Sequence, residues 1–304
     1  MYFLRRILFA IPLLLVVSML CFTLMHIVPG GPFDSERRPA SPEVDRNLNA
    51  KYHRDEPIWK QYGRYLGELV RGDFGVSMKY RDHTVNDIIA QGLPVSMVLG
   101  GLALCCAMGM GIPLGFYSAA QRGRWVGHAG ALLAIVMVCV PGFVIAPILI
   151  LVFAMKLKWF PVALWVTPWH MVLPPMVLGA YFAGRIARIL REGMLNAAQS
   201  EFVVAARAKG LSETAILLKH ALRIALLPVV SYVGPMLADL LTGSFVVENI
   251  FQIPGIGVFL VNSVQNRDDT MVVGLTMLYA VLLIGLNLAV DFAYTLLDPR
   301  VRYE

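Results

Sequence analysis

Long apolar runs separated by short polar segments make up most of the chain. Charged residues are absent from residues 7–33, 88–121, 125–155, 159–184 and 270–290. Residues 224–247 carry a single acid, Asp239. Each run exceeds the ~20 residues that an α-helix needs to cross ~30 Å of hydrocarbon, and none shows the two-residue alternation of a barrel strand. Because a helix satisfies its own backbone hydrogen bonds in lipid, the pattern predicts an all-α polytopic membrane protein with six transmembrane helices.

Composition agrees with this prediction. The chain of 304 residues is 58% hydrophobic and 15% charged, with a mean hydropathy of +0.66, which is far from a water-soluble domain of this length. Arg5 and Arg6 precede the first apolar run, as in a secretory signal peptide. That run is too long for a signal peptide and ends without a small-residue cleavage site, so we expect a retained first transmembrane helix over residues 1–28.

The distribution of basic residues predicts the orientation. With both termini in the cytoplasm, the four inner segments hold thirteen Lys and Arg residues and the two short outer loops hold three. Residues 29–93 carry ten more, but a loop of this length crosses the membrane largely regardless of its charge. The positive-inside rule therefore favours cytoplasmic termini. The net charge of +6 reflects this topology, and no soluble basic domain supports nucleic-acid binding.

The loop at 29–93 is expected to form a helical cap on the outer side. Ser41-Pro42-Glu43 is a typical helix start, with Ser as N-cap and Pro at the first helical position. A second helix is predicted after Pro57, where apolar residues recur at helical spacing, and Gly72–Ser77, with the sequence GDFGVS, predicts a turn. The aromatic residues of the second helix either pack on the membrane helices or meet a soluble partner outside.

About forty residues, 185–224, are expected on the inner side, far more than a helical bundle needs for a connection. The residues from about Leu190 to Lys209 favour a helix, Gly210 permits a sharp turn, and Ser212 can cap a second helix. Alanines at 205, 206 and 208 leave one side of the first helix nearly bare, so that another protein could approach its backbone. The alternative is an amphipathic hairpin that lies on the inner leaflet.

This arrangement resembles the cytoplasmic coupling loop of ABC-importer permease subunits. The general pattern is Glu-Ala-Ala, three residues, Gly, nine residues and Ile-x-Leu-Pro. Aligned on Gly210, this chain matches the pattern at Ala205, Ala206 and Leu222. It departs from the pattern at Val204, His220 and Arg223. Further stretches resemble the oligopeptide-permease B-subunit family along nearly the whole length. They are LRRILFAIPLLL, IVPGGPF, GDFGVS, PVSMVLG, ARAKGLS with KHALRIALLPVV, ENIFQIPGIG and LLDPRVRY.

The resemblance implies that the chain is one subunit of a multi-subunit transporter in a bacterial inner membrane. The domains would be the first helix (1–28), the periplasmic cap (29–93) and a five-helix permease core (94–304). The partners would be a homologous second permease subunit, two cytoplasmic ATPase subunits, a periplasmic peptide-binding protein, the oligopeptide substrate and membrane lipid. The residues expected to face the ATPase are Glu201, Ala205, Ala206, Arg207, Lys209, Gly210 and Leu211.

Two further regions are candidate sites. The resemblance implies that Pro254, Gly255, Ile256 and Gly257 form a short re-entrant element at an outer gate, whereas proline and glycine are equally typical of an ordinary turn. Asp239 is a candidate path-lining residue, because an acid within a membrane helix usually faces water or a partner charge, and it could meet the amino terminus of a peptide. For Asp291, nearer the inner end of its run, a structural salt bridge is expected.

The chain is expected to do no chemistry of its own. It has no GxxxxGK[ST] phosphate loop, so the resemblance places ATP and Mg²⁺ on partner subunits and predicts no cofactor here. Three alternatives remain: a dipeptide or nickel importer of the same class, an ion-coupled secondary transporter, and an intramembrane enzyme. A secondary transporter would leave the long basic inner loop unexplained, and an enzyme would need a nucleophile with its base or a metal pair in the spans.

Overall fold

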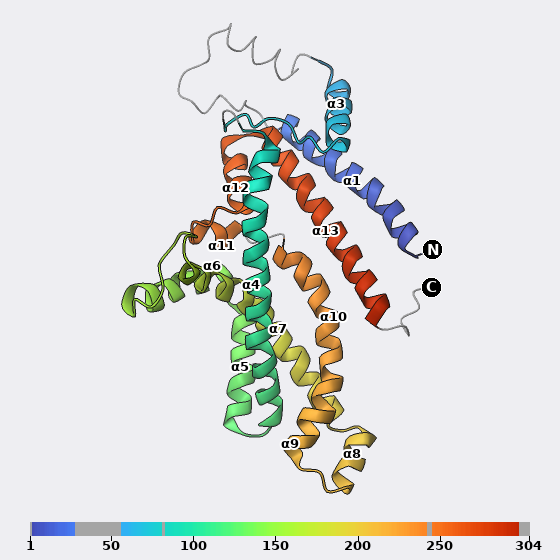
Figure 1. Cartoon of the computed structure of the whole chain (residues 1–304), viewed down its shortest axis with the longest axis vertical. Coiled ribbons are helices and arrows are strands. Elements are labelled where there is room, and N and C mark those ends of the chain that lie inside the picture. The colour runs from blue at the N-terminus through green and yellow to red at the C-terminus, as the bar shows by residue number, and fades with distance from the viewer. Residues whose placement is uncertain (1, 28–55, 81–82, 242–244, 298–304) are drawn as a thin grey trace. The chain divides into compact units, whose positions relative to one another are not determined.

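The structure is a computed structural model that describes residues 2–27, 56–80, 83–241 and 245–297. Every regular element in these ranges is helical, and the only β-type pairing there is a single bridge between Val76 and Thr84. In order, the elements are α1 (Tyr2–Ile27), α3 (Ile58–Val70), α4 (Val85–Ala120), α5 (Trp125–Cys139), α6 (Gly142–Leu149), the π-helix η1 (Ile150–Lys156), the 3₁₀-helix η2 (Pro168–Met171), α7 (Leu173–Ala197), α8 (Glu201–Ala208), α9 (Glu213–Ile216), the π-helix η3 (Leu217–Ala221), α10 (Leu222–Leu241), α11 (Phe245–Ile250), α12 (Ile256–Asn266) and α13 (Asp269–Leu297) (Figure 1).

Three of the described helices are long and apolar enough to cross a membrane. They occupy Val85–Ala120, Glu213–Leu237 and Asp269–Ala289, and a fourth crossing exists if Trp125–Cys139 and Gly142–Lys156 count as one broken span, bent by 109°. The helical, membrane-spanning class predicted from the apolar runs is therefore confirmed. The number of six spans and their orientation stay predictions.

Two apolar runs do not form single straight helices. Within 125–155, α5 ends at Cys139, and the chain bends at Pro141 before α6 begins. Within 159–184, residues 159–172 contain only the four-residue helix η2, and α7 begins at Leu173 and continues to Ala197. Prolines at 141, 161 and 168 break the helical hydrogen bonding in these runs, because proline lacks a backbone N–H and restricts the residue before it. A count of uncharged residues does not detect such breaks.

The chain divides into two units, and the first comprises Met1–Pro94 with Gly255–Leu288. In it α3 packs on α1: the ring of Phe22 lies 5.3 Å from that of Tyr62 and 6.2 Å from that of Tyr65, and the hydroxyl oxygens of Ser18 and Tyr62 are 2.8 Å apart. The predicted second helix of the outer loop is confirmed as α3. Tyr62 and Tyr65 pack on the apolar helix α1, in the direction of the first of the two interpretations, whereas Trp59 is exposed. The predicted helix start at Ser41 lies outside the described residues.

The predicted turn at Gly72–Ser77 is confirmed and is held by side chains. Gly72 and Gly75 have positive φ angles of +77° and +87°, and the backbone N–H of Gly75 donates to the carboxylate of Asp73. Asn86 of α4 accepts from the N–H of Phe74 and donates to the carbonyl of Gly72. The turn is therefore fixed to the first turn of α4.

A buried acid joins this turn to the start of α13. The carboxylate of Asp268 is fully buried and accepts hydrogen bonds from the hydroxyl of Ser77 and from the backbone N–H groups of Met78, Lys79 and Met271. The last of these bonds satisfies an N–H group in the first turn of α13, as an N-cap does. Asp268 thus connects two segments that are 190 residues apart in the sequence.

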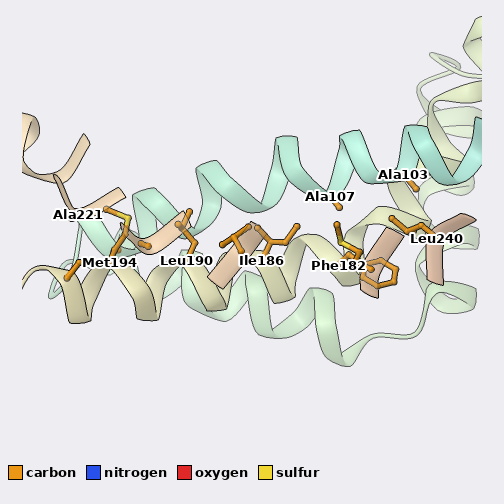
Figure 2. Close-up of a cluster of buried hydrophobic side chains, with 13 residues drawn as sticks. Ala103, Ala107, Phe182, Ile186, Leu190, Met194, Ala221 and Leu240 are labelled. Carbon is orange, nitrogen blue, oxygen red and sulfur yellow. The ribbon is translucent and has the colours of Figure 1, made fainter. Parts of the chain in front are cut away.

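Among the described residues, the second unit comprises Val95–Pro254 and 289–297, and α7 lies at its centre. Phe182, Ile186, Leu190 and Met194 follow one another at four-residue spacing and form a buried row along α7 (Figure 2). This row packs against residues of α4 and of η3 and α10. Those partners are Ala103, Ala107, Ala119, Ala221, Ala225, Val229, Met236 and Leu240.

Glycines allow α7 to approach its neighbours at backbone distance. A Cβ atom at Gly111 of α4 would lie 2.7 Å from the carbonyl oxygen of Ala183, and one at Gly115 would lie 2.7 Å from that of Ala187. From the other side, a Cβ atom at Gly184 of α7 would lie 2.6 Å from the carbonyl oxygen of Ala134 in α5. The spacing of Gly111 and Gly115 is the G-x-x-x-G pattern with which membrane helices pack closely.

Replacing Gly111 by Ala is expected to destabilise the protein, because the added methyl group would force α4 and α7 apart. Overpacking of this kind costs about 1–3 kcal/mol. Gly109→Ala is the matched control two residues away, since a Cβ atom there would have no neighbour within 4 Å and the helix gains from alanine. Thermal unfolding in detergent should show a lower midpoint for Gly111→Ala alone. Equal midpoints for the two variants would contradict the close contact.

Candidate functional site

The segment after α7 forms a small helical hairpin of α8 and α9 (Figure 1). The continuous helix expected from about Leu190 to Lys209 is wrong: α7 ends at Ala197 and α8 begins at Glu201. At the break Ser200 has an extended backbone, with φ −78° and ψ 151°, and its hydroxyl donates to the carbonyl of Ala197. Serine competes with the helix through such local hydrogen bonds, and propensity summed over the window did not detect this.

The predicted sharp turn at Gly210, here called the elbow, and the predicted helix cap at Ser212 are confirmed. Gly210 has φ +78°, a conformation that favours glycine, and its N–H donates to the carbonyl of Arg207 at 2.9 Å. The N–H of Leu211 donates to the carbonyl of Ala206 at 3.3 Å, which closes the end of α8. Ser212 is the N-cap of α9 and accepts from the N–H of Ala215 at 3.4 Å. These contacts are local, so the sequence predicted them.

The two faces of the hairpin differ. Val203, Ala206 and Ile216 form its buried interior, and Ala206 is only 6% exposed. Ala206 therefore packs α8 against α9 with its own methyl group. The other residues expected to face an ATPase are exposed: Glu201, Ala205, Arg207, Lys209, Gly210 and Leu211. Two large apolar side chains that the sequence reasoning did not assign to this surface, Phe202 and Val204, are exposed as well.

A charged pair spans the elbow. Nε of Arg207 lies 2.6 Å from Oε1 of Glu213, and its Nη2 lies 3.1 Å from Oε2, so the contact is bidentate. The hydrogen bond with Glu213 and the negative charge of that residue raise the pKa of Arg207. Exposed ion pairs add little to stability, but a bidentate pair fixes the direction of both side chains. The elbow thus presents Arg207 in a defined position.

The segment expected at an outer gate lies between two short helices. Gly255 is the N-cap of α12, and Ile256 and Gly257 are buried, while Pro254 is exposed. A Cβ atom at Gly92 of α4 would lie 3.2 Å from the backbone nitrogen of Ile256, so α4 supports this segment closely. With six and eleven residues, α11 and α12 are ~9 and ~16 Å long, too short to cross a bilayer.

Asp239 lies on α10 near an arginine that the sequence reasoning had placed in the inner loop. Arg185 belongs to the middle of α7, and its guanidinium carbon lies 5.1 Å from the ring centre of Tyr181 and 5.9 Å from that of Tyr232 of α10. Asp239 and Arg185 interact electrostatically, and both are exposed. The signal was present in the sequence: Tyr181, Arg185, Arg188 and Glu192 recur at spacings of four, three and four.

Glu248 is a second acid that the sequence reasoning missed. It lies in α11, is fully buried, and accepts a hydrogen bond of 2.8 Å from the hydroxyl of Ser96 in α4. Glu248 directly follows the apolar run 224–247, and a charged residue at the end of such a run is typical of the start of a loop. Its burial shows that this part of the chain is packed inside the second unit.

Comparison with known proteins identifies the family. Residues 111–303 match the family described as the binding-protein-dependent transport system inner membrane component, so the chain belongs to this family of membrane permeases. The chain is 44% identical over 304 residues to the oligopeptide transport system permease protein OppB of Haemophilus influenzae, with 98% of each chain covered. It is 43% identical over 289 residues to the dipeptide transport system permease protein DppB of Bacillus subtilis, covering 95% and 94% of the two chains.

A solved structure agrees on the fold. The inward-facing MetNI methionine ABC transporter contains a chain that matches with a TM-score of 0.53 and 19% identity, covering 71% of this chain and 97% of that one. The resemblance to the oligopeptide-permease B-subunit family, indicated by motifs along the whole sequence, is thus confirmed.

Replacing Ala206 by Leu is expected to open the hairpin, because the larger side chain does not fit between Val203 and Ile216. Ala205→Leu adds the same volume on the exposed side and should leave the hairpin closed. Limited trypsin digestion in nanodiscs, read as the rate of cleavage after Arg207 and Lys209, checks this. We expect cleavage several times faster in Ala206→Leu only. Equal rates in both variants would show that Ala206 does not hold the two helices together.

Proposed function

We propose that the chain is the transmembrane permease subunit of an ATP-driven importer that moves oligopeptides from the periplasm into the cytoplasm of a bacterium. The observation that carries this proposal is the exposed α8–α9 hairpin in a chain 44% identical to an oligopeptide permease. In this proposal the chain has six spans with both termini in the cytoplasm, and the hairpin lies on the cytoplasmic side of the inner membrane.

The hairpin has the features of a docking element. Its interior is closed by Val203, Ala206 and Ile216, so it can keep its shape while its outer face contacts another protein. That face offers exposed apolar side chains at Phe202 and Leu211 and a positive charge at Lys209. A membrane-surface hairpin would expose all of its apolar side chains on one continuous face, whereas here Val203, Ala206 and Ile216 close the space between α8 and α9.

The proposed partners follow from what this chain lacks in its sequence. Without a phosphate-binding loop, the energy for transport comes from two ATPase subunits, which bind ATP and Mg²⁺. A homologous second permease subunit completes the path, and a periplasmic peptide-binding protein delivers the substrate. ATP closes the ATPase pair, the hairpin moves with the ATPase surface, and α7 and α10 transmit the movement to the membrane. This requires only that the hairpin contacts the two ATPase states differently.

A dipeptide importer is the second candidate. The identity to the dipeptide permease of Bacillus subtilis is 43%, nearly the same as to the oligopeptide permease, so overall similarity does not separate the two. The longer match to the oligopeptide permease, which covers 98% of this chain, favours the first candidate. Uptake of dipeptides and of longer peptides by the reconstituted complex distinguishes them.

In either case Pro254, Gly255, Ile256 and Gly257 form the outer gate in this proposal, and Asp239 lines the path. Support for the gate is its position between two helices that are too short to cross the membrane, with Gly92 packed behind it. Support for Asp239 is its exposure on α10, two residues beyond the stretch Glu213–Leu237 that is long and apolar enough to span. An exposed acid there is costly unless it faces water or a partner.

Gly210→Val is expected to uncouple transport from ATP hydrolysis. A β-branched residue at φ +78° is strained by about 1–2 kcal/mol, so the elbow should change shape although no atom lies within 4 Å of the added Cβ. Gly123→Val is the matched control: Gly123 has φ +83°, equally open space, and lies in the α4–α5 turn. In proteoliposomes with the ATPases and the binding protein, uptake per ATP should fall for Gly210→Val only. Normal uptake per ATP in that variant would contradict the coupling role.

Asp239→Asn is expected to lower uptake of peptides with a free amino terminus relative to N-acetylated peptides of the same sequence. Loss of one charged hydrogen bond corresponds to about tenfold or more in affinity. Asp291→Asn removes the same charge from α13 and serves as the control. Competition between the two peptide forms for uptake measures the ratio. An unchanged ratio in Asp239→Asn would exclude contact with the amino terminus.

A further inference from the structure

One side of α7 carries polar and charged side chains, which are costly on a helix that faces lipid. Tyr181, Arg185, Arg188 and Glu192 are all exposed and lie one helical turn apart, so they form a single stripe along α7. The buried row on the same helix faces α4 and α10 instead (Figure 2). The stripe is therefore separate from the buried row. Its Arg188 and Glu192 line a cavity with residues of α4 and α5, whereas Arg185 lies beside Tyr232 of α10.

The depth of Arg185 follows from the packing of α7. Ala183 and Ile186, on either side of Arg185, contact Gly111 of α4. The apolar run of α4 ends at Gln121, ten residues after Gly111. Ten residues of helix are ~15 Å long. A hydrocarbon core is ~30 Å thick, so this contact lies within the apolar stretch of α4 rather than at its end. A charged side chain at that depth avoids lipid and faces a water-filled path or a partner.

The surroundings of Arg185 hold its guanidinium in a fixed position. Tyr181 precedes it by one turn on α7, and Tyr232 comes from α10, with ring centres 5.1 Å and 5.9 Å away. These are cation–π distances, and the planar guanidinium is well suited to stacking. Stacking uses the faces of the guanidinium, and a hydrogen bond to Tyr232 uses one of its N–H groups. The N–H groups on the remaining edge, which lie in the plane, are left for a planar anion. A carboxylate is the anion that matches this fork.

We propose that Arg185, held between Tyr181 and Tyr232, binds the C-terminal carboxylate of the peptide during its passage. The inference rests on the proposed function and extends it. Asp239 on α10 provides the opposite charge for the amino terminus, so one face of the permease offers a cation and an anion to a zwitterionic chain. Recognition of the two termini rather than of the side chains suits a path that passes peptides of many sequences.

The site is tested in the complete transporter, reconstituted with its partner subunits and binding protein. Tripeptides of one sequence are compared as free acid and as C-terminal amide. Arg185→Gln should lower uptake of the free acid by about tenfold or more, the size expected for loss of one charged hydrogen bond, and should change uptake of the amide little. Arg188→Gln removes the same charge one turn further along the stripe and should leave both rates near those of the wild type. The binding protein is identical in all samples, so only the ratio of variant to wild type is interpreted.

Other outcomes overturn the proposal. Equal losses for acid and amide would show that Arg185 only supports the structure, and equal losses in Arg188→Gln would show a general effect of charge. Arg185 could instead only neutralise Asp239. In that case the double variant Arg185→Gln/Asp239→Asn should restore uptake of an N-acetylated free acid, whereas a carboxylate site predicts that this uptake stays low.

Arg185→Lys is the second variant if Arg185→Gln does not assemble, because lysine keeps the positive charge but lacks the planar guanidinium. An unchanged ratio of free-acid uptake to amide uptake in Arg185→Lys would exclude the site. Absence of all peptide uptake by the wild type would refute the proposed function itself.

Discussion

The backbone contact between α4 and α7 is the constraint on which the second unit depends. Gly111 and Gly115 on one helix meet the carbonyl oxygens of Ala183 and Ala187 on the other, at distances that exclude any side chain. In a membrane there is no hydrophobic driving force between helices, so close packing of small residues has to supply the association. That contact sets which side of α7 is buried and, as a consequence, which side carries its charges.

The position of α7 connects the two regions to which we assign function. Its middle carries Arg185 next to Tyr232 and Asp239 of α10, and its end leads through Ser200 into the hairpin. The row from Phe182 to Met194 packs α7 against both spanning neighbours over most of its length. In the proposed function, movement of the hairpin would reach the charged stripe through the break at Ser200 and the end of α7.

Local features of this chain could be predicted well. The helix after Pro57, the turn at Gly210 and the cap at Ser212 each depend on contacts within a few residues. The turn at Gly72–Ser77 could be predicted from its two glycines, although Asn86 and Asp268 also hold it. The continuous helix to Lys209 was wrong for a local reason as well, since Ser200 bonds to the carbonyl of Ala197 and interrupts it. Propensity describes an average over a window, whereas a single serine decides where a helix ends.

By itself, the sequence determined the helical membrane class, the family and the hairpin motif, because apolar run length, motif order and turn residues are properties of neighbouring positions. Only the tertiary structure decided that Arg185 lies in the middle of α7, that Ala206 is inside the hairpin while Ala205 is outside, and that Asp268 joins α13 to the turn at Ser77. The burial of Ala206 depends on its packing against Ile216 of the next helix, and the bonds of Asp268 depend on a segment 190 residues away. The sequence records the charge of a residue, but the partner helix decides whether that charge is buried, paired or open to a path.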